Sequence, residues 1–150
     1  MKYKVERLKS CPFLKLEGLG VLGYNIFADM YGCDANLLDS IKYLRRLLKG
    51  AADTGNMHIV KVFFHRYYPQ GITGLVIVKE SHIALHTWPE YAFASVDIFL
   101  CGNNSDPYKT LKHIENGLKP SKIIIKSVER GVIHEGIKEV MGNRRDLSRI

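Results

Sequence analysis

Side chains able to act as nucleophiles, bases or acids gather in one short stretch, VKESHIALHTWPEYAFASVDIFLCG, which spans residues 78–102. A Glu-Ser-His triplet at 80–82 is followed by a second imidazole, His86, and by the thiol of Cys101. A hydroxyl or thiol beside an imidazole suits nucleophilic catalysis, because the imidazole accepts the proton of the attacking group. The apolar residues between them indicate strands, on which a partly buried polar group needs a hydrogen-bonding partner.

The alternation of side chains along a strand sorts these groups by face. Within residues 81–88, the imidazoles of His82 and His86 point to the same side. Cys101 ends the next apolar segment, and Thr73 lies on the segment before. If these strands pair, we expect hydroxyl, imidazole and thiol groups to converge at one end of the sheet.

Two other interpretations of the histidines compete with catalysis. Zinc accepts histidine and cysteine ligands, but His82 and His86 are four residues apart, which separates their Cα atoms by ~13 Å along a strand. Because one ion could reach both only if the strand bends, we expect no metal site. Alternatively, the histidines are ordinary hydrogen-bonded residues on a half-wetted sheet face.

Periodicity and turn residues predict the elements that position these groups. Asp34 and Asp106 are expected helix N-caps, the first followed by leucines at helical spacing as far as Leu48. Strands are expected at residues 20–31, 58–68, 72–79, 81–88, 92–101 and 122–129. The segment at 72–79 is apolar throughout, which is typical of a strand covered on both faces. Short central connections favour antiparallel pairing, so the order predicts an α+β fold, a two-layer sandwich with a mostly antiparallel sheet and helices on one face.

Length and charge restrict the class of protein. A chain of 150 residues predicts a single domain, 1–150, of which 1–18 is an N-terminal extension. The net charge of +7 would suit a nucleic-acid partner, but residues 1–18 and 119–150 carry +3 and +4, so the centre is neutral. Lys79 is the only Lys or Arg between residues 70 and 104. We therefore expect solvated basic ends and no nucleic-acid partner.

Cysteine usage and hydropathy favour a cytoplasmic location. Cys11, Cys33 and Cys101 have no CxxC spacing and cannot all pair, which suits a reducing compartment. No apolar run approaches the ~18 residues of a membrane helix, so we expect no membrane association. The N-terminal residues have no apolar stretch behind their basic side chains, and we expect no signal peptide there.

The segment GITGLVIVKESHIALHTWPEYAFASVDIFLCG, residues 71–102, resembles the core of the prokaryotic S-adenosylmethionine decarboxylase proenzymes. The pattern of that family is a hydroxyl residue, then Glu-Ser-His, His-Thr-Trp-Pro-Glu and Asp-x-Phe-x-Cys-Gly, and all its parts occur here in order. Weaker similarity runs from about Gly20 to Gly131 and includes YGCD and FHRYYPQG. The resemblance implies the fold of that family.

The resemblance also implies that the chain cuts itself between Glu80 and Ser81, giving a β chain of residues 1–80 and an α chain of 81–150. The Ser81 hydroxyl would attack the Glu80 carbonyl, and elimination and hydrolysis would turn Ser81 into a pyruvoyl group. This covalent, self-generated cofactor would form a Schiff base with the substrate amine and accept electrons as CO₂ leaves.

The family match assigns roles to three more side chains of the stretch. His86 matches the residue that assists processing as a base, and Cys101 matches the donor of a proton to the substrate carbon. Thr73 matches an auxiliary hydroxyl that is usually serine. Relatives form homodimers, so the resemblance implies a homodimer of processed αβ protomers. An apolar sheet face with helices on only one side also needs a cover, which a second copy can supply.

The implied substrate is a small molecule, S-adenosylmethionine, whose decarboxylated product donates aminopropyl groups in spermidine and other polyamine synthesis. Tyr67 and Trp88 match residues that stack on adenine, and Glu90 matches one that reaches the ribose. Members of the same scaffold decarboxylate arginine or ornithine instead, and an uncleaved regulatory pseudoenzyme is a further alternative. The retained Trp88 and Glu90 favour S-adenosylmethionine.

Three positions depart from the family pattern without removing a reacting group. Asn25 stands where relatives usually have histidine, Lys79 where many have serine, and Ala92 where glycine is common. We expect self-cleavage to survive these changes.

Overall fold

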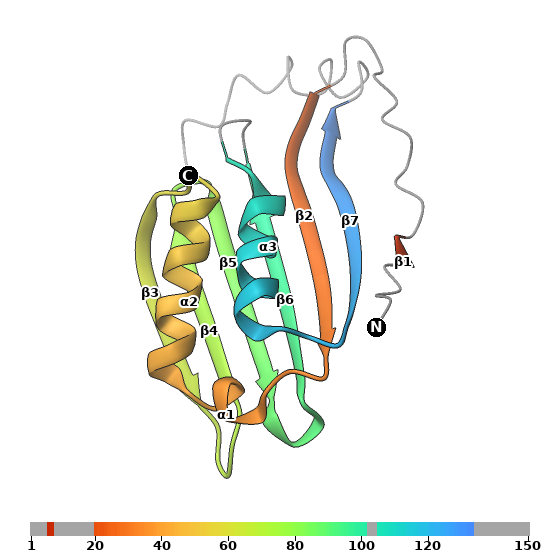
Figure 1. The fold of residues 1–150 in the computed structure, drawn as a ribbon. Helices are drawn as coiled ribbons and strands as arrows, with labels where there is room; N and C mark the ends of the chain where they lie inside the picture. The colour runs from red at the N-terminus through yellow and green to blue at the C-terminus, as the bar shows by residue number, and fades with distance from the viewer. Residues whose placement is uncertain (1–5, 8–19, 102–104, 134–150) are drawn as a thin grey trace.

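In the computed structural model, the described part of the chain comprises residues 6–7, 20–101 and 105–133, which form one sheet with helices on one side (Figure 1). The strands are β1 (Glu6–Arg7), β2 (Gly20–Tyr31), β3 (Ile59–Arg66), β4 (Ile72–Val78), β5 (Ser81–Trp88), β6 (Phe93–Leu100) and β7 (Lys122–Ile133). The helices are α1 (Ala35–Leu38), α2 (Ile41–Thr54) and α3 (Pro107–Leu118), and a 3₁₀ turn, η1 (Pro89–Tyr91), joins β5 to β6.

The sheet has the strand order β1-β7-β2-β6-β5-β4-β3. Its neighbouring strands are antiparallel except for β1 beside β7. The predicted α+β two-layer sandwich with a mostly antiparallel sheet is therefore confirmed. The final strand extends beyond the predicted end at residue 129 to Ile133, because β7 pairs with β2 along its whole length. Most of the expected N-terminal extension, 1–18, lies outside the described residues.

One face of the sheet is buried beneath the helices. The apolar stripes of α2 and α3, each at helical spacing, meet inward-facing residues of the central strands. The largest fully buried side chains of these helices and strands are Ile26, Met30, Leu44, Leu48, Ile72, Val76, Ile83, Leu85, Ile98, Ile114 and Leu118. Each contributes ~1.5–3 kcal/mol through removal of apolar surface from water. This core holds the central strands in a single register, and the register positions the site.

The single helix expected after Asp34 is instead two helices, α1 and α2, separated at Asp39 and Ser40. Ser40 has an extended backbone, and its hydroxyl accepts a hydrogen bond from the N–H three residues later, so it is a second N-cap. The Asp39 carboxylate accepts hydrogen bonds from the Gly71 N–H and the Arg66 guanidinium. These contacts tie the corner to the β3–β4 hairpin, whereas the spacing of the leucines continues unchanged across the break.

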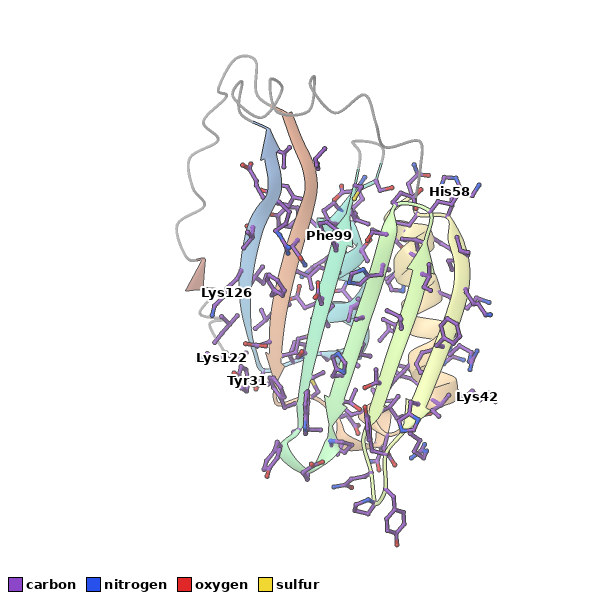
Figure 2. The ribbon with its side chains drawn as sticks, turned by 180° about the vertical axis from the view of Figure 1, so that it is seen from behind. Tyr31, Lys42, His58, Phe99, Lys122 and Lys126 are labelled. Atoms are coloured by element: carbon purple, nitrogen blue, oxygen red, sulfur yellow. The ribbon has the colours of Figure 1, made fainter. Side chains whose placement is uncertain are left out.

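The opposite face of the sheet, called the open face below, is not covered by any helix of the described residues (Figure 2). Partly exposed aromatic side chains, such as Phe27 at 38% and Trp88 at 39% exposed, lie on this face among polar residues such as His82 and His86. The expectation that 72–79 is covered on both faces is therefore wrong for the single chain, since buried and half-buried residues alternate along β4. A broad exposed apolar surface marks an interaction site.

Ala92, the first residue after η1, has a strained backbone. Its φ of 49° and ψ of 38° are left-handed, and its carbonyl accepts a hydrogen bond from the Cys33 N–H at 2.9 Å. This conformation costs an L-residue about 1–2 kcal/mol, so Ala92→Gly should raise the free energy of unfolding by ~0.5–1 kcal/mol after the greater freedom of unfolded glycine is deducted. Thermal unfolding of Ser81→Ala chains, which cannot undergo the implied cleavage, should show a melting temperature higher by ~1–4 °C.

Ala94→Gly is the matched control, because Ala94 lies fully buried within β6. It should lower the melting temperature, since glycine in a strand loses a packed methyl group and gains freedom in the unfolded chain. A fall of similar size for both variants would contradict the strain assigned to Ala92.

Candidate active site

The turn between β4 and β5 presents the bond that the family pattern marks for cleavage. Only Lys79 and Glu80 separate the two strands, and Ser81 is the first residue of β5. Ser81 has a φ of 144°, a region that residues other than glycine rarely adopt. Such strain persists where surrounding contacts enforce it and is common at functional sites. The Glu80–Ser81 peptide is therefore held in an unusual backbone conformation.

The carbonyl of Glu80 is polarised by the neighbouring strand. The backbone N–H of Cys101, just beyond β6, donates a hydrogen bond to the Glu80 oxygen at 2.8 Å. An N–H aimed at a carbonyl oxygen stabilises the negative charge that develops there when a nucleophile attacks. Cys101 thus approaches the bond with its backbone, and its exposed side chain lies at the same end of the sheet.

The side chain of Glu80 is held by His58, the residue just before β3. Its carboxylate accepts hydrogen bonds from the His58 ring Nδ1 at 2.6 Å and from the His58 backbone N–H at 3.0 Å. Burial raises the pKa of the Glu80 carboxyl, but the hydrogen bonds from His58 outweigh it and leave that pKa below its ordinary value. The group is therefore a carboxylate at neutral pH, and its stabilising contribution is lost only as the pH falls through this lowered pKa.

His82 is the imidazole that reaches Ser81 within the chain. Its Nδ1 lies 3.3 Å from the Ser81 hydroxyl oxygen, within hydrogen-bonding distance. The same ring stands 6.1 Å from Phe99, centroid to centroid, on the adjacent strand. Glu80, Ser81, His82 and Cys101 together make up the Ser81 end of the open face.

A second polar group lies further along the same strands. Thr73 on β4 and His86 on β5 are directly paired, and the Thr73 hydroxyl oxygen lies 2.9 Å from the His86 Nδ1. The Thr73 hydroxyl also lies 3.3 Å from the Tyr67 hydroxyl, and Ser95 faces His86 from β6. The predicted auxiliary hydroxyl and the predicted processing imidazole are thus in contact.

Aromatic side chains surround this second group. The Trp88 ring is 6.3 Å from His86 and 5.3 Å from Phe93, and Phe93 is 4.9 Å from Tyr31 on β2. Flat exposed rings of this kind provide stacking surfaces for a planar ligand. Glu90 follows on η1, where its carboxylate accepts a hydrogen bond from the Gln70 side chain at 3.2 Å. Thr73, His86, Tyr67, Trp88 and Glu90 make up the His86 end.

The structure does not bring the two ends together within one chain. Ser81 pairs with Leu100, whereas His86, five residues later, pairs with Thr73. Five residues of strand correspond to roughly 16 Å between Cα atoms. The expected convergence at one end of the sheet therefore holds for the Ser81 hydroxyl, the His82 imidazole and the Cys101 thiol. It fails for Thr73 and His86, which the antiparallel register places together at a separate position.

Asn25 is a buried polar residue on β2, the strand between β6 and β7. The Asn25 amide donates to the Asp97 carboxylate, and the Arg130 guanidinium donates to the Asn25 oxygen at 3.4 Å. The Asn25 amide therefore has hydrogen-bonding partners on both neighbouring strands. Among residues 6–7, 20–101 and 105–133, no three His, Cys, Asp or Glu side chains are grouped as a metal site requires. No helix in these same ranges is long and apolar enough to span a membrane.

Two contacts at the Ser81 end escaped sequence reasoning. His58 is 22 residues from Glu80 and carries no motif that links the two. The Cys101 backbone N–H is equally invisible, because a sequence identifies side chains and not the direction of a backbone amide. Only strand pairing across the β3–β4–β5–β6 meander could have revealed either contact.

The sequence and the fold of this chain are both similar to those of known proteins. The family described as S-adenosylmethionine decarboxylase matches residues 24–131. S-adenosylmethionine decarboxylase proenzymes of Thermotoga petrophila and Thermoanaerobacter sp. are 40% and 37% identical, over 79% and 81% of this chain and 92% and 98% of theirs. The crystal structure of the adenosylmethionine decarboxylase from Aquifex aeolicus is 38% identical, with a TM-score of 0.72 over 77% of this chain and 95% of that one. The resemblance inferred from the motifs is confirmed.

Cys33 is excluded as a reactive thiol by its surroundings. It is 4% exposed, and burial raises the pKa of its thiol from 9.0 to about 11. At pH 8 the folded chain should therefore contain about a hundredfold less Cys33 thiolate than the unfolded chain. Alkylation with iodoacetamide, followed by peptide mass spectrometry, should be slower by at least that factor in buffer than in urea. Equal rates in both solvents would contradict the burial of this thiol.

Proposed function

The chain belongs to the S-adenosylmethionine decarboxylase family, and we propose that it is a self-processing, pyruvoyl-dependent decarboxylase of S-adenosylmethionine. The observation that carries this proposal is the Glu80–Ser81 bond, with Ser81 in a strained conformation and the Glu80 carbonyl bound by the Cys101 N–H at 2.8 Å. Its product would be the aminopropyl donor of spermidine synthesis. The cysteine usage favours a cytoplasmic location.

Self-cleavage follows from the groups around this bond. The Ser81 oxygen attacks the Glu80 carbonyl carbon while the oxygen of that carbonyl is stabilised by the Cys101 N–H. The Ser81 nitrogen leaves with the hydroxyl proton, so an ester replaces the amide. His86, the base that the family match assigns, accepts the Ser81 Cα proton, so the Cβ–Oγ bond breaks and the Glu80 carboxylate leaves. Water replaces the nitrogen, which departs as ammonia, and residue 81 becomes the pyruvoyl group at the start of the α chain, 81–150, with 1–80 as the β chain.

Decarboxylation uses the same end of the sheet. The pyruvoyl group supplies an electron-accepting carbonyl that the common side chains lack. The Cys101 thiol, exposed beside it, donates the proton that the substrate carbon needs after CO₂ leaves. Tyr67 and Trp88 stack on the adenine and Glu90 binds the ribose, which requires these residues to stand near residue 81.

One chain alone cannot meet that requirement, because the two ends are roughly 16 Å apart. We therefore propose a homodimer in which two open faces pack against each other in opposite directions. Sheets stacked face to face lie ~10 Å apart, so the His86 end of one copy meets the Ser81 end of the other. Two-fold symmetry then creates two equivalent sites, each built from both copies.

The size and composition of the open face support this arrangement. With a spacing of ~4.8 Å across the six longer strands and ~3.3 Å along the eight residues of β5, the face measures roughly 29 by 26 Å. This is close to the ~800 Å² that each partner contributes to a standard interface. Half-exposed aromatic residues such as Phe27 and Trp88 also favour burial against another surface.

Self-cleavage predicts two fragments from the purified chain. Denaturing mass spectrometry should find a break between Glu80 and Ser81, with the second fragment blocked to Edman sequencing and reducible by borohydride. Ser81→Ala should abolish the break, because no hydroxyl remains to attack. A wild-type chain of 17.1 kDa that stays intact on long incubation would favour the regulatory pseudoenzyme.

The two-copy site predicts rescue between inactive variants. His86→Ala chains alone should cleave at least about a hundredfold more slowly, the usual scale for loss of a general base. When they are co-expressed with differently tagged Ser81→Ala chains, the His86→Ala chains should be cleaved, because the second copy supplies an intact His86. Cleavage of His86→Ala chains on their own would instead assign the base to His82 within the same chain.

Substrate choice is tested with the processed protein. Release of labelled CO₂ from carboxyl-labelled S-adenosylmethionine should exceed release from arginine or ornithine, because only the first offers adenine to Trp88. Trp88→Ala should raise KM for S-adenosylmethionine about tenfold or more, in line with the ~1–3 kcal/mol typical of stacking on a base. Preference for arginine in the wild type would overturn the proposed substrate.

A further inference from the structure

His58 has three contacts with the turn that is proposed to be cut, and none of them belongs to the family motif. Its backbone carbonyl accepts from the Lys79 N–H at 2.9 Å, and its backbone N–H donates to a Glu80 carboxylate oxygen at 3.0 Å. Its ring Nδ1 lies 2.6 Å from the other carboxylate oxygen. His58, just before β3, thereby contacts both residues that precede the bond, Lys79 and Glu80.

The opposite side of the same turn is held by Cys101. Its N–H binds the Glu80 carbonyl, so Glu80 is fixed through its side chain on the β3 side and through its main chain on the β6 side. The Lys79 N–H is bonded to the His58 carbonyl as well, so the backbone on both sides of Glu80 and its side chain all have partners. Turning the Glu80 carbonyl away from the Cys101 N–H would strain or break these bonds, and they accompany the unusual φ of 144° at Ser81.

We propose that His58 is a positioning residue for self-cleavage, which holds Glu80 through its ring so that the Cys101 N–H stays aimed at the carbonyl that is attacked. The inference rests on the proposed self-cleavage. His58 touches neither the hydroxyl nor the carbonyl that reacts, and it acts through the Glu80 carboxylate. Small losses of alignment at a reacting centre reduce rates by up to about a hundredfold.

The exposed fractions of the two side chains agree with this role. The Glu80 side chain is 16% exposed and the His58 side chain 63%, so the carboxylate is fixed against the protein while the imidazole covers it from solvent. A side-chain contact whose imidazole is largely exposed contributes little to global stability. Its removal should therefore change the rate of cleavage far more than the melting temperature, which separates a positioning role from a structural one.

The test compares His58→Ala, which removes the ring and keeps the backbone contacts, with His58→Asn, whose Nδ2 can occupy the place of Nδ1. The chains are made by cell-free translation, and cleavage is followed in time after synthesis stops. His58→Ala should cleave about 10- to 100-fold more slowly, His58→Asn within about threefold of wild type, and decarboxylation per cleaved chain should be unchanged. His113→Ala is the control, because His113 lies on α3 away from the turn.

A double-mutant cycle and amide exchange show whether the ring acts through Glu80. If it does, His58→Ala combined with Glu80→Gln should be no slower than the slower single variant, whereas independent effects would multiply. In the uncleavable Ser81→Ala chain, His58→Ala should speed hydrogen exchange at the Cys101 amide about tenfold, with the melting temperature within ~2 °C.

The outcomes separate the role of His58 from the proposed self-cleavage on which it rests. Wild-type cleavage with an equally fast His58→Ala chain, or with multiplicative effects in the cycle, would overturn the role of His58 and leave the proposed function standing. A wild-type chain that never cleaves would overturn both. Slow cleavage by His58→Ala with rescue by asparagine and an unchanged melting temperature supports the positioning role.

Discussion

The antiparallel register of β4, β5 and β6 governs where each reacting group lies. The Lys79–Glu80 turn allows only two residues between β4 and β5, and this places Thr73 opposite His86. The connection through η1 sets the register of β5 and β6 and places Ser81 opposite Leu100. A shift of one residue would turn His86 toward the helices and move Leu85 out of the core. The buried helix-facing side chains prevent that shift, so the hydrophobic core determines the chemistry of the open face.

The character of the open face follows from the same strand register. Helices cover one side of the sheet, and the same alternation that fills the core sends imidazoles, hydroxyls and aromatic rings to the other side. Because the register separates the Ser81 end from the His86 end, the proposed site requires a second molecule. The half-exposed aromatic residues would give such a molecule an apolar surface to bury, so the proposed assembly and the proposed catalysis share one physical origin.

The turn that is proposed to be cut has a strained residue, Ser81, next to a residue that is held on two sides, Glu80. Ser81 occupies a backbone region that a hairpin would ordinarily reserve for glycine, and contacts from His58 and Cys101 hold the preceding residue from both sides. Ala92 shows the same principle in a second place, where the carbonyl of a left-handed alanine accepts a hydrogen bond from the distant Cys33 N–H. In each case long-range contacts impose a conformation that the local sequence does not favour.

The sequence by itself determined the fold class, the central strands almost to the residue, the family, and the side chains proposed to react, because alternation, turn residues and a contiguous motif are local signals. It did not determine the break between α1 and α2, since Asp39 leaves the helix to bind the distant Gly71 and Arg66. Nor did it reveal that Ser81 and His86 stand apart, or that His58 grips Glu80. These features depend on which strands pair and in what register, and that is decided by burial of the whole core, which brings together residues far apart in the chain.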